Sequence, residues 1–335
     1  MKALQIPRPR RIRVIELPAP APGPGEILLR IHYVGFCGSD LNTFRGNNAM
    51  AKADVIPGHE IGAVIAATGP GVPEHLRPGQ TVTADPYTHC GHCASCRAGR
   101  YNACEHNETL GVQRDGAMRE YLTVPWQKVI PAEGISVRDA ALIEPMSVGF
   151  HAVSRGQVCD SDTVLVIGCG MVGLGAVVRS VRRGATVIAA DIDPEKLSLA
   201  RELGAAFTYD TSDEWRDLPA PDVVIEAVGS PATYRLAIER VDFCGRVVCI
   251  GYAKGDVELP TGLIVKKELA VLGSRNATPT DFDAVIRAVK GLPRQLLDRF
   301  ISGIVRPEEA QEALARWDAA PGKVFRILTQ WNTEN

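Results

Sequence analysis

The glycine-rich segment Gly168-Cys-Gly-Met-Val-Gly173 constrains the fold of this chain more than any other feature of its sequence. It follows a short apolar run at 163–167 and precedes residues with helical spacing over 171–183. Between a strand and a helix, such glycines allow a tight turn, a close approach of the backbone to a pyrophosphate, and close packing of helix on strand. The segment therefore predicts a dinucleotide-binding loop with its phosphates at the amino end of the helix.

The residues after this loop continue the alternation of strands and helices. Apolar runs at 185–190, 222–226 and 246–250 predict strands, and the residues from Pro194 to Gly204 predict a helix. This order indicates a parallel, doubly wound α/β domain. The second strand ends at Asp191, whose carboxylate would accept hydrogen bonds from the adenosine ribose hydroxyls and repel a 2′-phosphate. We therefore expect NAD rather than NADP.

The residues before about 147 have a different pattern. Short apolar stretches alternate with prolines and glycines, and they predict strands at 12–16, 26–34, 61–67, 80–84 and 120–124. A chain of 335 residues is also too long for one small core. The sequence thus predicts a β-rich first domain followed by the α/β domain.

Four cysteines lie close together within the β-rich part, in Cys90-Gly-His-Cys93-Ala-Ser-Cys96 and then at Cys104. The clustering, and the odd total of nine cysteines, favour a metal over disulfides. Four thiolates complete a tetrahedral zinc shell, so this zinc would be structural. The ferredoxin iron–sulfur run is a poorer match, because its fourth cysteine comes sooner and precedes a proline.

A second set of potential ligands is spread along the same part of the chain. Cys37 and His59 lie in expected loops, Glu60 follows His59, and Glu144 comes just before the pattern changes. Taken singly, Cys37 would be interpreted as a core cysteine and His59 as a loop histidine. In a chain that also has a dinucleotide-binding domain, these residues instead predict a catalytic zinc with three protein ligands and one open position. Such an ion lowers the pKa of a bound alcohol, so that a zinc-bound alkoxide forms and its carbon releases hydride to a nicotinamide.

These motifs together resemble the zinc-dependent medium-chain dehydrogenases, and most closely their sorbitol, or polyol, dehydrogenase branch. The matching strings are Gly35-Phe-Cys-Gly-Ser-Asp40, Pro57-Gly-His-Glu60, the four-cysteine segment and Glu144-Pro-Met-Ser-Val-Gly-Phe-His151. The resemblance implies a GroES-like catalytic domain over 1–147 with a structural zinc lobe at about 86–106. It also implies a Rossmann NAD-binding domain over 148–272 and a return to the catalytic domain over 273–335.

The resemblance also implies roles for individual residues. Cys37, His59 and Glu144 would hold the catalytic zinc, Glu60 would enter or leave its shell, and Ser39 would take the substrate proton. Two positions depart from the family pattern. Asn42 stands where many members have a histidine that passes the proton onward, and Thr43 replaces a tyrosine common in the polyol branch. The residues expected at the cofactor are Gly168, Gly170, Met171, Val172, Gly173, Asp191, Val228 and Gly251.

The expected substrate is a secondary alcohol of a polyol, sugar or sugar acid, with sugar acids favoured. Arg275 matches a substrate-facing arginine of the polyol branch, and Arg45 and Arg114 are further candidates that suit a carboxylate or phosphate. The alternatives are a simple alcohol, glucose or threonine dehydrogenase, and a non-catalytic NAD-binding sensor. The sensor hypothesis predicts loss of a zinc ligand or of Ser39, and all of these residues are present.

The composition is ordinary for a globular enzyme and limits the partners we expect. The formal net charge of −2 gives no basic surface for nucleic acid or an anionic membrane. No apolar run reaches the length of a membrane span, and the first residues lack the apolar centre of a signal peptide. We therefore expect a cytoplasmic enzyme that forms a homodimer or homotetramer, the oligomer being implied by the resemblance alone.

Four further cysteines are interpreted as small core residues: Cys159, Cys169, Cys244 and Cys249.

Overall fold

The computed structural model describes residues 1–211 and 218–332, and the chain divides into two compact units. The first unit comprises Met1–Glu144, Val289–Pro293 and Leu297–Asn335, and the second comprises Pro145–Ala288 and Arg294–Leu296. The first unit is therefore built from segments near both ends of the sequence, whereas the second is almost continuous. Residues 273–288 cluster with the second unit.

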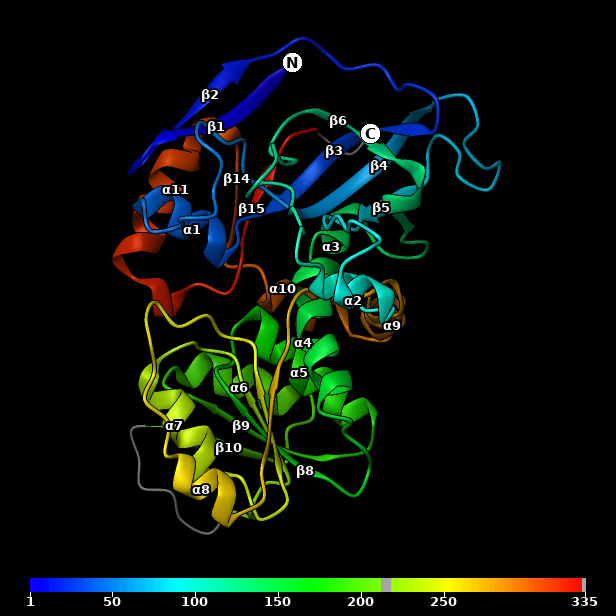
Figure 1. The fold of residues 1–335 in the computed structure, drawn as a ribbon. Coiled ribbons are helices and arrows are strands. Elements are labelled where there is room, and N and C mark those ends of the chain that lie inside the picture. Colours follow the sequence, from blue (N-terminus) through cyan, green and yellow to red (C-terminus); the bar gives the residue numbers. More distant parts are fainter. Residues whose placement is uncertain (212–217, 333–335) are drawn as a thin grey trace. The chain divides into compact units, whose positions relative to one another are not determined.

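A seven-stranded sheet is the centre of the first unit (Figure 1). Its strands run in the order β14 (Gly303–Val305), β15 (Ile327–Gln330), β3 (Glu26–Gly35), β4 (Glu60–Thr68), β5 (Thr81–Ala84) and β7 (Val129–Pro131), with β6 (Tyr121–Pro125) paired to β3 outside this path. The long strand β3 pairs antiparallel with β4, β6 and β15. The end of the chain thus completes a sheet that its beginning starts.

Shorter elements surround this sheet. The strands β1 (Lys2–Arg8) and β2 (Arg11–Glu16) form an antiparallel pair. The helices are α1 (Gly38–Arg45), α2 (Ala94–Arg97), α3 (Val137–Ala140) and α11 (Ala310–Ala319), with single 3-10 turns η1 (Tyr101–Ala103), η2 (Trp126–Lys128), η3 (Pro307–Glu309) and η4 (Pro321–Lys323). The helix α10 (Arg294–Arg299) is divided between the two units, because its first three residues belong to the second. One apolar core contains side chains from β1, β3 and β4 together with Leu314 and Trp317 of α11.

The second unit contains a six-stranded parallel sheet. Its order is β10 (Phe207–Asp210), β9 (Thr186–Asp191), β8 (Thr163–Ile167), β11 (Val223–Glu226), β12 (Arg246–Cys249) and β13 (Ala270–Gly273). The helices are α4 (Ile143–Arg155), α5 (Met171–Arg182), α6 (Pro194–Glu202), α7 (Pro231–Arg240), α8 (Thr261–Lys266) and α9 (Pro279–Lys290). The order of the strands reverses between β8 and β11, which is where dinucleotides bind in such sheets.

Most of the expected elements are confirmed. The strand at 163–167 and the helix from residue 171 are found as β8 and α5, and Asp193 caps α6 by accepting a hydrogen bond from the Glu195 N–H. The interpretation of four cysteines as core residues was wrong for Cys159 and Cys244, which are exposed. Among the described residues, no helix has the length and apolarity needed to cross a bilayer.

Candidate active site

The four cysteines of the expected structural site lie together in the first unit. The sulfur atoms of Cys90, Cys93, Cys96 and Cys104 are all within 4.8 Å of one another. Zinc–sulfur bonds of about 2.3 Å place the sulfurs of a tetrahedral site about 3.8 Å apart, and the Cys93 and Cys104 sulfurs are separated by 3.8 Å. The helix α2, which begins after Cys93, turns the segment so that Cys96 faces the other three. The group therefore fits zinc.

Local donors already favour thiolates in this group. The Ser95 hydroxyl and backbone N–H groups lower the pKa of Cys93 to about 5, and the backbone N–H of His92 lowers the pKa of Cys90. Burial and the neighbouring Cys93 raise the pKa of Cys96 to about 11. A divalent cation would remove this conflict, because it stabilises all four sulfurs in the deprotonated form.

Cys37, His59 and Glu60 form a second group in the first unit, with one ligand atom from each within 4.8 Å of the others. Cys37 is the N-cap of α1, where its N–H donates to the Asp40 carboxylate at 2.8 Å. Glu60 is the first residue of β4, opposite Gly35 of β3. A Cβ on Gly35 would lie 2.0 Å from a Glu60 oxygen, so only glycine leaves room for this carboxylate.

Several polar atoms of this group have no hydrogen bond, although the charge of Glu60 is paired with Arg326, whose Nε lies 3.1 Å from Glu60 Oε2. His59 Nδ1 and both carboxylate oxygens of Glu60 are buried without a hydrogen bond, although unpaired buried polar atoms are costly. Burial would raise the pKa of the Cys37 thiol, but contact with His59 and the charges of His59 and Arg326 lower it to about 7. A half-buried thiol with a lowered pKa, a buried imidazole and a buried carboxylate are a donor set that suits zinc.

Glu144 lies outside this three-residue group. Its carboxylate accepts a short hydrogen bond from the Tyr87 hydroxyl, and both side chains are buried. Burial raises the pKa of Glu144, while the charge of His59 and the Tyr87 hydrogen bond oppose the rise. Of the four predicted ligands, the structure thus brings Cys37, His59 and Glu60 together and leaves Glu144 held by Tyr87.

Ser39 lies in the first turn of α1, two residues after Cys37. Its hydroxyl oxygen is buried and has no hydrogen-bond partner, so it is free to accept a proton from a neighbouring hydroxyl. Its backbone carbonyl accepts a hydrogen bond from the Thr43 hydroxyl at 2.9 Å, one turn later. Thr43 therefore supports the helix turn that carries Ser39.

The glycine loop of the second unit joins β8 to α5. Gly168 has a φ of +93°, and a Cβ on Gly173 would lie 1.7 Å from the Gly168 carbonyl oxygen. Gly170 is different, because a Cβ there would meet no atom within 4 Å. Gly168 thus permits the turn, and Gly173 permits the close packing of the start of α5, with Met171 and Val172, onto the strand. Gly170 faces the open space that a pyrophosphate requires.

Asp191 ends β9 beside this loop. Its carboxylate accepts hydrogen bonds from the backbone N–H groups of Cys169, Ile192 and Asp193 at 2.7, 2.8 and 3.0 Å. These bonds fix the carboxylate against the glycine loop, and its two oxygens keep lone pairs for further donors. Its position at the carboxyl end of the strand next to β8 is where a ribose-binding acid is expected.

The comparisons with known proteins establish the family of this chain. A family model described as "Alcohol dehydrogenase GroES-like domain" matches residues 23–134, and one described as "Zinc-binding dehydrogenase" matches residues 172–291. L-galactonate-5-dehydrogenase of Escherichia coli K12 is 36% identical over 270 residues, which cover 78% of this chain and 79% of the relative.

The chain belongs to the zinc-binding dehydrogenase family.

Two solved structures extend the similarity to nearly the whole chain. Galactitol-1-phosphate dehydrogenase from Escherichia coli is 30% identical with a TM-score of 0.89, covering 98% of this chain and 100% of its own. A short chain alcohol dehydrogenase from E. coli CFT073, complexed with NADH, is also 30% identical, with a TM-score of 0.88 over 98% and 99% of the two chains. The expected GroES-like and Rossmann domains and the polyol dehydrogenase branch are thereby confirmed.

Two buried charged residues beside the candidate sites were not predicted from the sequence. Arg326, just before β15, is buried with its Nε 3.1 Å from Glu60 Oε2. Glu226 ends β11 and accepts hydrogen bonds from the Val228 and Gly229 N–H groups at 2.9 and 2.8 Å. A strand ending in a buried glutamate at the reversal of strand order could have drawn attention to Glu226, whereas no local signal marks Arg326.

The remaining cofactor candidates lie around this same strand end. Val228 is 51% exposed, directly after β11, and a Cβ on Gly251 would lie 2.1 Å from the Gly229 nitrogen. The second oxygen of Glu226 is buried without a hydrogen bond. The two loops after β11 and β12 therefore touch each other, and they leave one unsatisfied acceptor beside the expected cofactor.

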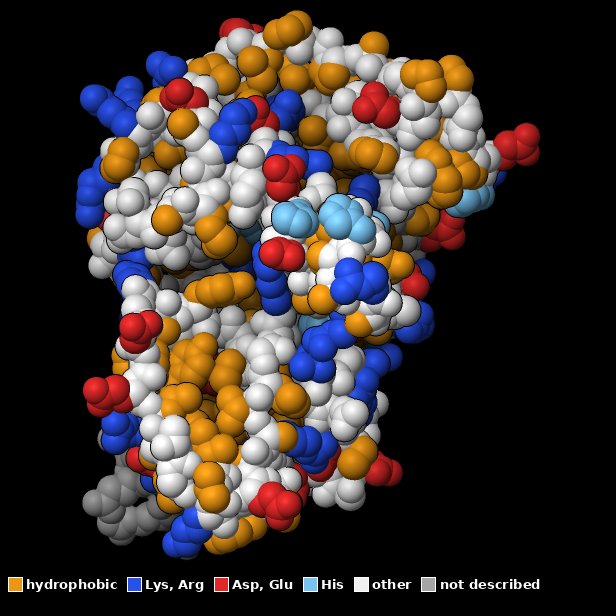
Figure 2. Space-filling view, viewed as in Figure 1, with side chains coloured by type: hydrophobic (Ala, Val, Ile, Leu, Met, Phe, Trp, Pro, Cys, Tyr) orange, Lys and Arg blue, Asp and Glu red, His pale blue; other side chains and the backbone are white. Residues whose placement is uncertain are grey.

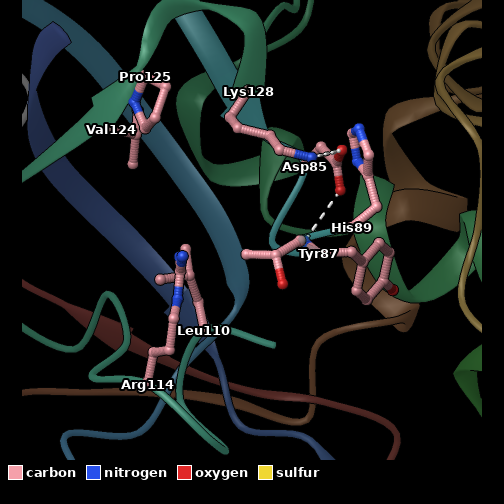
Figure 3. Close-up of a pocket in the computed structure, with 9 residues that line it drawn as sticks. Asp85, Tyr87, His89, Leu110, Arg114, Val124, Pro125 and Lys128 are labelled. Atoms are coloured by element: carbon pink, nitrogen blue, oxygen red, sulfur yellow. Dashed lines mark hydrogen bonds and ion pairs between the residues drawn. The ribbon is translucent and has the colours of Figure 1, made fainter. Parts of the chain in front are cut away.

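The three candidate arginines have different surroundings. Arg45 Nε lies 2.5 Å from an Asp318 carboxylate oxygen, so its charge is already neutralised. Arg275 is half-buried just after β13. Arg114 lines an open pocket of about 210 Å³ in the first unit. Figure 3 shows it reaching into this pocket from the side opposite Lys128, which is paired with Asp85.

Proposed function

We propose that this zinc-binding dehydrogenase oxidises a secondary alcohol of a polyol or sugar acid, with NAD as hydride acceptor. The observation that carries the proposal is the group of Cys37, His59 and Glu60 with the unpartnered Ser39 hydroxyl near it. When bound, zinc supplies a Lewis acid that lowers the pKa of an alcohol.

Each residue of the group has a distinct proposed task. Cys37 and His59 hold the zinc, and Glu60 and Glu144 are alternative third ligands. Tyr87 keeps Glu144 in place while Arg326 does the same for Glu60. Ser39 Oγ takes the proton of the substrate hydroxyl, and water must carry it onward, because Asn42 has no basic group.

The proposed cofactor preference is for NAD over NADP. It rests on Asp191, whose carboxylate is fixed by three backbone N–H groups and would lie against a ribose hydroxyl. A 2′-phosphate at the same place would meet this negative charge. The open space at Gly170 and the free N–H groups at the start of α5 suit the pyrophosphate.

Within this class we propose an anionic substrate, a sugar acid or sugar phosphate, because Arg114 lines a pocket that also includes Tyr87, the partner of Glu144. Arginine binds carboxylates and phosphates through two parallel hydrogen bonds. Arg275 is a further candidate from the second unit. Arg45 is a poorer one, since Asp318 already binds it.

The test is NADH formation on a panel of aldonates, polyol phosphates, neutral polyols and simple alcohols, with and without a chelator. We expect chelator-sensitive turnover on the anionic polyol derivatives and little on ethanol. Chelator-insensitive turnover would contradict the zinc mechanism. Turnover on simple alcohols alone would contradict the proposed substrate, and NADH binding without any turnover would favour a sensor.

We also propose that the chain forms a homodimer or homotetramer. The strand β13 is at the edge of the second unit's sheet, and Val271 on it and Val265 before it are exposed. An apolar edge strand is a template for pairing with another chain. Light scattering of the wild type and of Val271→Lys checks this, with a shift to monomer expected in the variant.

The cysteine thiolates of the proposed zinc sites suit the reducing cytoplasm, where we place the enzyme.

A further inference from the structure

A second group of potential metal ligands adjoins the four-cysteine cluster. One ligand atom each from Cys90, His92 and His106 lie within 4.8 Å of one another. Cys90 belongs to both groups, so the two would share one sulfur. Histidine side chains gather over the part of the surface around α2 in Figure 2.

The two groups differ in their access to solvent. Cys93, Cys96 and Cys104 are buried, Cys90 is half-buried, and His92 and His106 are exposed. A zinc ion arriving from water therefore meets the two imidazoles before it can reach the buried sulfurs. Cys90 is the point at which the exposed group joins the buried one.

The ring of His92 is oriented for a metal. Its Nδ1 lies 3.0 Å from the Cys90 carbonyl oxygen, to which it donates when it carries the proton. That bond leaves Nε2 with its lone pair free, which is how most metal-binding histidines are arranged. The His92 and His106 rings have centroids 5.9 Å apart and are tilted by 32°, a spacing that allows one ion to contact both.

We propose that Cys90, His92 and His106 form an exposed zinc-capture site that loads the four-cysteine cluster. A captured ion would be held by two imidazole nitrogens and the Cys90 thiolate. It would then move inward by ligand exchange. Bonds to the sulfurs of Cys93, Cys96 and Cys104 replace the two nitrogen bonds, and any thiol protons leave to water. The Cys90–zinc bond persists throughout, so the ion is never released.

Metal exchange into the zinc-loaded enzyme tests the loading step. Cadmium added to the holoenzyme replaces zinc at thiolate sites and produces a sulfur-to-metal charge-transfer absorption. We expect this absorption to appear about tenfold more slowly in the double variant His92→Gln/His106→Gln, with the same final amplitude. The same final amplitude shows that both thiolate sites, the four-cysteine cluster and the Cys37 site, still take up the metal.

An equilibrium titration tests the capture step separately. The zinc-loaded wild type should take up one further Zn²⁺ per chain in competition with a chromophoric chelator, and the double variant should not. Two single variants serve as controls. His75→Gln removes an exposed histidine elsewhere, and His89→Gln removes one that packs on Tyr101, with ring centroids 4.6 Å apart. Both controls should behave as the wild type.

The results distinguish the parts of the proposal. If the double variant keeps the extra zinc with unchanged affinity, no capture site exists. If the extra zinc is lost but cadmium exchange keeps its wild-type rate, the site binds metal without loading the cluster, and the proposed transfer is wrong. If His89→Gln slows exchange as much as the double variant, general metal attraction by surface histidines explains the effect instead.

Discussion

The guanidinium of Arg326 lies with its Nε 3.1 Å from Glu60 Oε2, and both side chains are buried. Arg326 also donates a hydrogen bond to the Phe36 carbonyl oxygen at 2.6 Å, directly before Cys37. Burial raises the pKa of Glu60, and the charge of Arg326 opposes that rise. One arginine thus supports two adjacent parts of the proposed zinc site, the Cys37 backbone and the Glu60 carboxylate.

Removal of this arginine should be costly for stability. We expect Arg326→Met to lower the free energy of unfolding by about 3–5 kcal/mol, because it removes the guanidinium that is paired with the buried Glu60 carboxylate. The double variant Glu60→Gln/Arg326→Met should lose less than Arg326→Met alone. Denaturant unfolding of the zinc-loaded protein measures both. Arg306→Met, at an exposed position, is the matched control, and an equal loss there would contradict the argument.

Loss of the Ser39 hydroxyl should affect the chemical step. We expect Ser39→Ala to reduce kcat by about 100-fold or more, because we propose Ser39 Oγ as the group that takes the substrate proton. NADH binding and zinc content should stay at wild-type levels. Asn42→Ala on the same helix should keep most of its activity, since its side chain has no part in the proton path. A larger loss in Asn42→Ala than in Ser39→Ala would overturn this assignment.

Substitutions of Asp191 and Asp193 should have different effects, the first on cofactor preference and the second on the capping of α6. We expect Asp191→Ala to raise KM for NAD. The kcat/KM with NAD, divided by the kcat/KM with NADP, should fall toward one, because the negative charge near the ribose is gone. Asp193→Ala should leave this ratio unchanged and cost about 1 kcal/mol of stability, through loss of the α6 cap. Steady-state kinetics and thermal unfolding distinguish them. A wild type that prefers NADP would refute the role of Asp191.

The buried pair of His151 and Asp281 predicts a pH-dependent contribution to stability. Burial would raise the pKa of Asp281, but hydrogen bonds from His151 at 2.9 Å and from Thr278 outweigh it and lower the pKa. A carboxyl with a depressed pKa stabilises the fold above its ordinary pKa of 3.8, and this stabilisation disappears as the pH falls through the folded-state value.

We therefore expect Asp281→Asn to lower the free energy of unfolding by about 1–3 kcal/mol at neutral pH. This loss should shrink progressively as the pH falls below 3.8 and through the lower folded-state pKa of Asp281. The unfolding midpoint of wild type and variant across this pH range measures the difference. Asp283→Asn, two residues later and exposed, should differ little from the wild type at any pH. If the unfolding midpoints of Asp281→Asn and the wild type differ by the same amount down to strong acid, the titration argument is contradicted.

Features that depend on nearby residues were predictable from the sequence. The four cysteines and the glycine loop each lie within one short segment, so spacing alone indicates the shape of the site. The strands β10 and β13 escaped prediction, because each has four residues at the edge of a sheet and no clear alternation. Long-range pairs also escaped it. Neither the bond from Tyr87 to Glu144 nor the approach of Arg326 to Glu60 leaves a local pattern.

The pairing of β15 with β3 has a consequence for how the protein is made. The edge of β3 at Tyr33, Val34 and Gly35 is covered by a strand from the other end of the sequence. The second unit, in contrast, needs no residue after 296 and is complete once that residue has emerged from the ribosome. During translation the dinucleotide-binding half can therefore fold while the half that begins the chain still lacks its last strands. Nascent chains would carry an open sheet edge and an incomplete catalytic centre until the final segment emerges, and this interval is when a holding chaperone would matter most.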